Sequence, residues 1–290
     1  MTAKHAICII AHKNAEQINL LLKLLDHPLI DFYLHLDKKS QLKTADIEKP
    51  VYSQITFVDR HDARWGDISL IETELELFRA VVESGEVYAY VHLISGQDMP
   101  TKSPDYILNY FDKKSIKGKE FVTFWQDEKQ VDRLKYYWLC TKHMRNGILY
   151  KIIRHSLLLL QKIIHVNRLR NAPLVFKYGS EWVSLTHKAV HYLVSEYPKY
   201  QGVFKYTVCS DELYKQMLLW GGQFHFSEKG NLRYAKFIGA SPEIIHTDKV
   251  ADLVASPDIL FARKFDMSLD RDCIKVLVSR INKFKERNNK

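Results

Sequence analysis

The sequence predicts an α/β protein whose central sheet is mainly parallel and flanked by helices. Residues 6–10 form a continuous apolar run, which is typical of a strand buried on both faces. Apolar residues at helical spacing follow within 18–25, and a second strand pattern occupies 32–36. A strand, a helix and a strand of these lengths form a β–α–β unit, in which the two strands run parallel.

Further elements are expected along the chain. Strand patterns occur at 55–58, 88–94, 120–125 and 183–185, and helical patterns occur at 67–83, 187–196 and 268–286. Asn14 is expected to cap the first helix, with Gln17 completing a capping box. Pro198 is expected to end the helix that begins at 187, because a proline inside a helix removes a hydrogen bond.

Composition agrees with a globular protein that forms a single domain over residues 1–290. The chain has 290 residues, of which 46% are hydrophobic and 27% are charged. Its net charge of +9 favours an anionic partner: nucleic acid, anionic lipid or a phosphorylated ligand. The four cysteines are widely spread and form no Cys-x-x-Cys pair, which indicates a reducing compartment. No targeting segment or transmembrane helix is expected.

Polar side chains follow the predicted strands. His12 and Asp37 come directly after strand ends, and a Gly-Gln-Asp loop places Gln97 and Asp98 after another. Parallel sheets bind their ligands at the carboxyl ends of strands, so these residues are candidates for a binding site. The alternatives are that His12 is a loop histidine without a role and that the Gln97–Asp98 loop is a plain turn.

Ser210, Asp211 and Glu212 form a candidate catalytic segment. Ser210 is expected to cap a helix, with the two acids in its first turn. Acids are favoured at that position because they complement the helix dipole, so the pattern can also be explained without any catalytic role. A helix dipole would also keep Glu212 ionised, which is the state that a general base needs.

Two adjacent cations, Arg263 and Lys264, lie within the apolar stretch 260–266. Buried neighbours would hold both side chains in a fixed direction, and two fixed positive charges suggest a bound polyanion. The alternative is that Arg263 pairs with a nearby carboxylate and that Lys264 is solvated.

A metal site is not expected. The Asp-x-Asp sequence of this chain, at 270–272, falls at the start of the last predicted helix, where acids complement the helix dipole. The aspartates at strand ends are single. If the ligand is a diphosphate, arginine and lysine would therefore neutralise it in place of a metal ion.

Residues 141–170 differ from the rest of the chain, because they contain no Asp or Glu. The basic residues of this segment are Lys142, Arg145, Lys151, Arg154, Lys162, Arg168 and Arg170. Aliphatic residues at helical spacing between Ile148 and Ile164 predict a basic amphipathic helix, inserted into the α/β domain. Such a helix suits the surface of an anionic membrane. It also suits a helix docked on the domain with its basic edge in solvent.

Five short motifs, taken in order, resemble a known family. They are His35-Leu-Asp37-Lys-Lys, Ser95-Gly-Gln-Asp-Met-Pro-Thr-Lys, Gly179-Ser-Glu-Trp, Ser210-Asp-Glu212 and Leu260-Phe-Ala-Arg-Lys-Phe-Asp. Over roughly residues 4–275, the chain resembles the core-2/I-branching β-1,6-N-acetylglucosaminyltransferases, a family that includes peptide O-xylosyltransferases. The resemblance implies a glycosyltransferase-A-like fold, an inverting mechanism and no metal cofactor.

The resemblance also implies roles for particular residues. Glu212 matches the catalytic base, Lys264 matches a ligand of the donor diphosphate, and Arg263 would be the second ligand. Asp37 matches the uridine-binding aspartate, and His12 is assigned to the same nucleotide site. The walls of the donor and acceptor pocket are assigned to Gln97, Asp98, Ser180, Glu181 and Trp182. A second arginine of the animal branching enzymes falls, without gaps, on Ser241 here, so that contact would be absent or replaced by Arg263.

The sequence therefore predicts a metal-independent enzyme that moves GlcNAc from a UDP-sugar to a hydroxyl of an acceptor glycan in surface polysaccharide synthesis. Transfer of xylose or another sugar is the first alternative. A non-enzymatic basic protein that binds anionic membrane or nucleic acid is the second. The disulfides and membrane anchor of the animal enzymes are absent from the pattern, which favours a bacterial-type cytoplasmic enzyme, peripheral at the inner face of the membrane, with no nucleic-acid partner.

Overall fold

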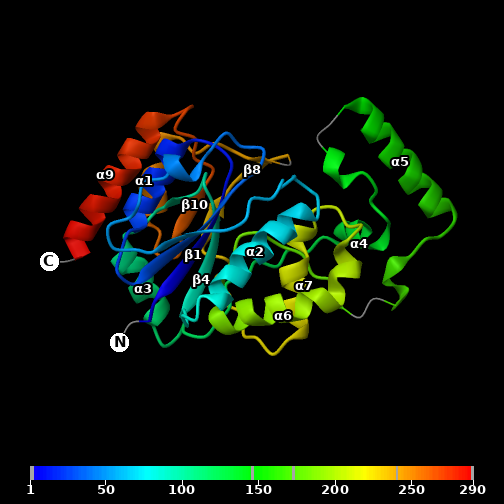
Figure 1. Ribbon diagram of the computed structural model, residues 1–290, viewed down its shortest axis with the longest axis horizontal. Helices are drawn as coiled ribbons and strands as arrows, with labels where there is room; N and C mark the ends of the chain where they lie inside the picture. The colour runs from blue at the N-terminus through cyan, green and yellow to red at the C-terminus, as the bar shows by residue number, and fades with distance from the viewer. Residues whose placement is uncertain (1–2, 145–146, 172–173, 240, 289–290) are drawn as a thin grey trace.

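The computed structural model describes residues 3–144, 147–171, 174–239 and 241–288, and within them a five-stranded sheet occupies the centre (Figure 1). The strand order is β3-β2-β1-β4-β6. Their bounds are His5–Ala11 for β1, Ile30–Leu36 for β2, Ile55–Phe57 for β3, Tyr90–Ser95 for β4 and Ser184–Thr186 for β6. Strands β3, β2, β1 and β4 run parallel, and β6 pairs antiparallel with β4 at the edge. The predicted mainly parallel α/β fold is thereby confirmed.

Helices cover both faces of this sheet (Figure 1). One face packs against α1 (Ala15–Leu25), α3 (Pro104–Asp112), α8 (Thr247–Ala255) and α9 (Arg271–Asn288). The other face packs against α2 (Ser69–Glu83), α6 (His187–Phe204) and α7 (Tyr214–Gly221). Alternate residues of β1 enter the two cores, because successive side chains of a strand point to opposite faces. Every residue of β1 and β2 is buried, as their apolar runs predicted.

A second, three-stranded sheet within the described residues carries the predicted cation segment. Its order is β5-β10-β7, with β5 at Met99–Pro100, β10 at Phe261–Arg263 and β7 at Arg233–Ala235. Strand β10 runs antiparallel to β5, with Ala262 opposite Met99. Since β5 follows the loop after β4, this pairing carries the cation segment to the carboxyl end of the central sheet. Two further short strands, β8 (Phe237–Ile238) and β9 (Ser241–Pro242), pair with each other.

The described residues of the ranges 128–144 and 147–171 leave the sheet and form an arm of short elements around one longer helix. These elements are η2 (Glu128–Val131), α4 (Asp132–Lys135), η3 (Thr141–His143), α5 (Ile148–Ile163) and η4 (Arg168–Asn171). Figure 1 shows α5 at the periphery of the molecule, away from the central sheet. The predicted helix of the basic segment is therefore present, while Arg145 lies outside the described residues. No helix within the described ranges is long and apolar enough to cross a membrane.

Four local expectations were wrong. Residues 120–125 form no strand, because only Glu120 and Phe121 pair, through isolated bridges to Phe226 and Ser184. Pro198 lies inside α6, which continues to Phe204, a fully buried residue whose packing holds the last turns in place. Asn14 does cap α1, but the Gln17 side chain bonds elsewhere and closes no capping box.

The fourth concerns Ser210, which caps no helix. Residues Ser210–Glu212 form a separate 3₁₀ turn, η5, and α7 begins after it, at Tyr214. The residue before the turn, Cys209, has left-handed backbone geometry with φ of 48°. This geometry redirects the chain before the acids, so that Ser210 becomes buried instead of standing at a helix end.

Candidate active site

The nucleotide candidates meet at the ends of two adjacent parallel strands. The amide of Asp37 donates to the carbonyl of Ala11 over 2.8 Å, which places the turn after β2 beside the residue that precedes His12. The carboxylate of Asp37 is buried and accepts from the amide and the ammonium group of Lys39, at 2.8 and 3.2 Å. His12 and Asp37 thus come together as expected, and Lys39 is a cation that the sequence patterns did not single out.

Charges around His12 connect this nucleotide end to the cation segment. Loss of hydration lowers the pKa of His12, and the positive charge of Lys13 lowers it further. The charges of Lys264 and Lys39 act in the same direction, while Asp37 opposes them. Lys264 is therefore close enough to His12 to influence its protonation, and the imidazole is favoured in its neutral form.

Arg263 forms an ion pair inside the protein. Its Nε lies 3.2 Å from Oδ1 of Asp98, and the two side chains are 13% and 2% exposed. The guanidinium carbon also lies 4.2 Å from the centre of the Trp182 ring, a cation–π contact. The predicted alternative, in which Arg263 pairs with a nearby carboxylate, is therefore the arrangement observed. A guanidinium has five N–H donors, so its capacity exceeds one ion pair.

The segment that follows the cations is held by the loop after β4. The amide of Phe265 donates to the carbonyl of Gln97 over 2.9 Å. The side-chain amide of Gln97 lies 3.3 Å from Oδ2 of Asp266, which also accepts from Lys13 over 2.5 Å. The buried Gln17 amide donates to the carbonyls of Gly96 and Phe265. Gln97 was assigned to the pocket wall, and in the structure its side chain fastens the cation segment to the strand ends.

The loop Gly179–Trp182 joins the cation segment to the candidate base. The amide of Gly179 donates to the carbonyl of Glu212 over 2.9 Å, while Trp182, at the other end of the loop, contacts Arg263. A Cβ atom at position 179 would overlap the carbonyl oxygen of Thr123, so this close approach requires glycine. Ser180 shapes the loop internally, because its hydroxyl accepts from the amide of Trp182 over 3.2 Å.

Glu212 faces an arginine that the sequence patterns missed. Nη1 of Arg133 lies 2.5 Å from Oε2 of Glu212, and the two side chains are 21% and 25% exposed. The carboxylate is thus partly accessible and has a fixed orientation. Arg133 lies 79 positions away in the sequence, so no local spacing relates it to Glu212.

The charge of Glu212 acts on two further carboxyl groups, the buried Asp211 and the half-buried Glu181. Burial and the charge of Glu74 raise the pKa of Glu181 to about 8, while Arg263 opposes the rise. Burial, together with the charges of Glu181 and Glu212, raises the pKa of Asp211 well above its ordinary value. Glu74 forms a fully buried ion pair with Lys215. Glu181 and Asp211 therefore tend to hold protons near neutral pH.

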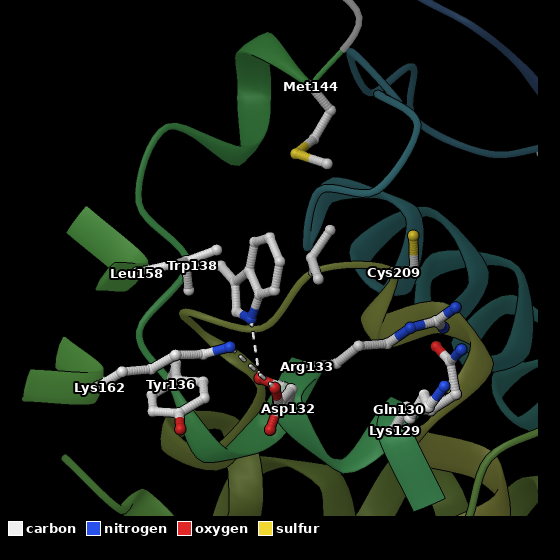
Figure 2. Close-up of a pocket in the computed structure, with 11 residues that line it drawn as sticks. Lys129, Gln130, Asp132, Arg133, Tyr136, Trp138, Met144, Leu158, Lys162 and Cys209 are labelled. Atoms are coloured by element: carbon white, nitrogen blue, oxygen red, sulfur yellow. Dashed lines mark hydrogen bonds and ion pairs between the residues drawn. The ribbon is translucent and has the colours of Figure 1, made fainter. Parts of the chain in front are cut away.

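A pocket of about 350 Å³ has Arg133 in its lining (Figure 2). Aromatic side chains from the stretch after α4, Tyr136 and Trp138, line it together with Leu158 and Lys162 of α5. The indole nitrogen of Trp138 donates to the carbonyl of Asp132 over 3.1 Å, which fixes the ring at the wall. The pocket combines aromatic surface with charged groups, and it lies next to the arginine that holds Glu212.

Comparison with known proteins identifies the family. A family model of the Core-2/I-Branching enzyme matches residues 6–240. The match includes the strand ends at His12 and Asp37, the Gly179–Trp182 loop and Glu212, and it ends before the Arg263–Lys264 pair. No curated protein matches the chain significantly. The mainly parallel sheet with helices on both faces is consistent with a glycosyltransferase-A-like fold.

Proposed function

The chain belongs to the Core-2/I-Branching enzyme family and is therefore a glycosyltransferase, and we propose that it transfers a sugar from a UDP-sugar to a hydroxyl of an acceptor glycan with inversion. The observation that carries this proposal is the Gly179–Trp182 loop. It touches the candidate base Glu212 at one end and the candidate diphosphate ligand Arg263 at the other. A base and a fixed cation held by one short loop fit a single displacement between an acceptor and a diphosphate leaving group.

In this mechanism Glu212 takes the proton of the acceptor hydroxyl while that oxygen attacks the anomeric carbon. A new carbon–oxygen bond forms as the bond to UDP breaks, and UDP leaves with the electron pair. Arg263 and Lys264 stabilise the charge that develops on the leaving diphosphate. Arg133 orients the Glu212 carboxylate through the 2.5 Å contact. We assign Arg133 a positioning role, because it acts through the base.

The donor would lie along the strand ends. Asp37 and His12 are proposed to bind the nucleotide, and their proximity to Lys264 supports one continuous site. Ser180, Glu181 and Trp182 are proposed as its wall. The carboxylate of Asp98 is buried against Arg263, so we propose that it orients this cation and does not contact the substrate.

The acceptor is proposed to approach through the pocket beside Arg133. Its aromatic side chains, Tyr136 and Trp138, offer the flat apolar surfaces that pockets for organic ligands commonly use. GlcNAc is our first candidate for the donor sugar and xylose is the alternative, with surface polysaccharide synthesis as the proposed role. The four cysteines are free thiols, which supports a reducing, cytoplasmic compartment.

We also propose that the reaction needs no metal ion. Support comes from the positive charges at the strand ends: Arg263, Lys264 and Lys39 can neutralise a diphosphate, as a metal ion does in other enzymes. Asp98 and Asp37 already pair with Arg263 and Lys39, and Lys39 also pairs with Asp62. The proposal therefore assigns charge neutralisation to side chains of this chain.

The decisive experiment substitutes Glu212→Gln, which keeps the size of the side chain and removes its basicity. We expect the rate of transfer to fall by about 10²–10⁴-fold, the usual contribution of a general base. Calorimetric affinity for UDP should stay within about threefold, because the carboxylate does not contact the nucleotide in this scheme. Each rate is measured in EDTA and again with added Mn²⁺, and the two should agree.

The matched control is Glu86→Gln, the same change at an exposed residue before β4, at the opposite end of the sheet. It should transfer sugar at the wild-type rate. Normal transfer by Glu212→Gln would remove the base assignment. Activity that is lost in EDTA and restored by Mn²⁺ would show that the cations do not replace a metal.

A further inference from the structure

Helix α5 is attached to the protein through its polar side chains. Its buried residues are Arg154 and Gln161, which are 8% and 9% exposed. Arg154 donates to the carbonyls of His143 and Met144, at 3.1 and 3.4 Å. Gln161 exchanges two hydrogen bonds with the backbone of Tyr137, at 2.7 and 2.9 Å. This is the inverse of an ordinary surface helix, which buries its apolar stripe and exposes its polar residues.

Two rows of aliphatic side chains face solvent instead. At 3.6 residues per turn, positions separated by 4, 11 and 15 residues share one side of a helix. The first row consists of Ile148, Ile152, Leu159 and Ile163, and the second of Leu149, Ile153, Leu160 and the C-cap residue Ile164. Their exposed fractions run from 37% at Ile153 to 77% at Ile148. Contiguous apolar surface of this kind on a soluble protein usually marks an interaction site.

Positive charge borders the aliphatic rows. The cations Lys151 and Lys162 lie along one edge with His155 between them, and all three side chains are exposed. The whole segment 141–170 contains no Asp or Glu, so its surface presents cations and aliphatic groups without any carboxylate of its own. An acid of the neighbouring α4, Asp132, lies 3.7 Å from Lys162. The complementary partner has negative charge at its surface and hydrocarbon just beneath it.

We propose that α5 docks this protein on anionic lipid bilayers. The two aliphatic rows enter the boundary between headgroups and acyl chains, and Lys151 and Lys162 at their edge contact lipid phosphates. Nucleic acid offers the charge but no apolar surface for the eight exposed aliphatic side chains. A second copy of the chain offers the apolar surface but brings an equally basic segment, whose positive charge repels the first.

Docking in this orientation has a consequence for the acceptor. The opposite side of α5 carries Leu158, and this residue and Lys162 line the pocket that also contains Arg133 (Figure 2). A bilayer against the aliphatic rows would therefore bring the pocket close to the lipid headgroups. A glycan carried on a lipid could then reach Glu212. This last clause rests on the proposed function, whereas the docking itself does not.

The test is vesicle flotation in the absence of any sugar. We expect the full-length protein to bind vesicles of phosphatidylcholine mixed with phosphatidylglycerol, and to bind pure phosphatidylcholine at least about tenfold more weakly. The double variant Ile152→Asp/Ile163→Asp should lose at least about tenfold in affinity for the mixed vesicles. Lys151→Gln should weaken binding about fivefold, since each lysine near an anionic surface contributes modestly.

The matched control is Val51→Asp/Val87→Asp, which adds the same two charges at aliphatic side chains that are 82% and 76% exposed. It should bind the mixed vesicles as the wild type does, and both double variants should keep the wild-type melting temperature. The proposal is overturned if the wild type does not float with mixed vesicles, or floats equally with neutral ones. It is also overturned if light scattering shows a dimer that the Ile152/Ile163 variant abolishes, without vesicle binding. Failure of sugar transfer would leave it standing, because the assay contains no substrate.

Discussion

Two largely buried arginines, each flanked by apolar residues in the sequence, have different roles in two regions of the molecule. Arg263 follows an apolar stretch at the strand ends, and Arg154 lies among aliphatic residues of α5. Arg263 pairs with the carboxylate of Asp98 and lies over the ring of Trp182. Arg154 donates to two backbone carbonyls. The charge of Arg263 is thus balanced by a carboxylate, whereas Arg154 uses its hydrogen bonds to attach α5 to the rest of the protein.

The comparison teaches that burial of a cation does not by itself identify a binding site. Both arginines are largely buried, with 13% of the Arg263 side chain and 8% of Arg154 exposed. Their partners separate them. Around Arg263 the protein has gathered acids and further cations, so the local charge can be redistributed when an anion binds. The segment around Arg154 contains no acid. The hydrogen bonds of Arg154 hold α5 so that its aliphatic side faces solvent.

The largest effect is expected from Arg263→Ala, which leaves the buried Asp98 without its ion-pair partner, while the charge of Arg233 still lowers its pKa. Burial raises the pKa of Asp98 and the charge of Arg263 opposes the rise, so the pKa will rise further in the variant. A group whose pKa is raised in the folded state makes its full contribution to the free energy of unfolding below its unfolded pKa. It loses that contribution as the pH rises through the folded pKa. Urea unfolding near pH 8 should therefore show a loss of about 3–5 kcal/mol, and a smaller loss near pH 5.

The matched control for this prediction is the double variant Asp98→Asn/Arg263→Ala. It removes the uncompensated carboxylate, so its free energy of unfolding should recover most of the loss and no longer depend on pH through this group. An Arg263→Ala protein that unfolds at wild-type denaturant concentration at both pH values would show that the Asp98 pair does not organise the strand ends.

A smaller effect is expected from Glu120→Gln. This variant tests whether buried carboxyl groups beside the central sheet make the free energy of unfolding depend on pH. Burial raises the pKa of Glu120 to about 7, although two bonds from Thr186 oppose the rise. Because the unfolded carboxyl titrates near 4.3, the wild-type free energy of unfolding should fall between about pH 4 and 7. The variant should flatten this fall by at most about 4 kcal/mol. Glu86→Gln, an exposed carboxyl, should leave the fall unchanged.

The sequence predicted those helices and strands that depend on residues close together in the chain. Strands β1 and β2 and helix α1 follow from apolar runs and spacing, and they lie within two residues of the expected bounds, with α1 beginning directly after its predicted cap, Asn14. Residues 120–125 have the composition of a strand, but their bridging partners, Ser184 and Phe226, are far away in the sequence. Pro198 is tolerated because tertiary packing of α6 outweighs the lost hydrogen bond.

The site could be predicted where a topological rule applied. His12, Asp37 and Asp98 were expected at one edge because parallel strands end there, and the structure places them so. Arg133 and Glu74 were missed, because their partners Glu212 and Lys215 lie 79 and 141 positions away. Which side of α5 faces the protein could not be predicted for the same reason. Periodicity identifies an apolar side of a helix, but not whether protein or solvent lies against it.

The smallest global effect is expected from Arg154→Met, which removes the anchor of α5 and leaves the sheet intact. The global free energy of unfolding should change by less than about 0.5 kcal/mol, since the helix contributes little to either core. Local opening should become easier, because two hydrogen bonds to backbone carbonyls are lost. Limited trypsin digestion at Lys151 and Lys162 should therefore accelerate about tenfold or more. Lys142→Met, the same change at an exposed cation outside α5, should leave those cleavage rates unchanged. If Arg154→Met instead destabilises the whole protein as strongly as Arg263→Ala, the two arginines do the same work, and α5 belongs to the core.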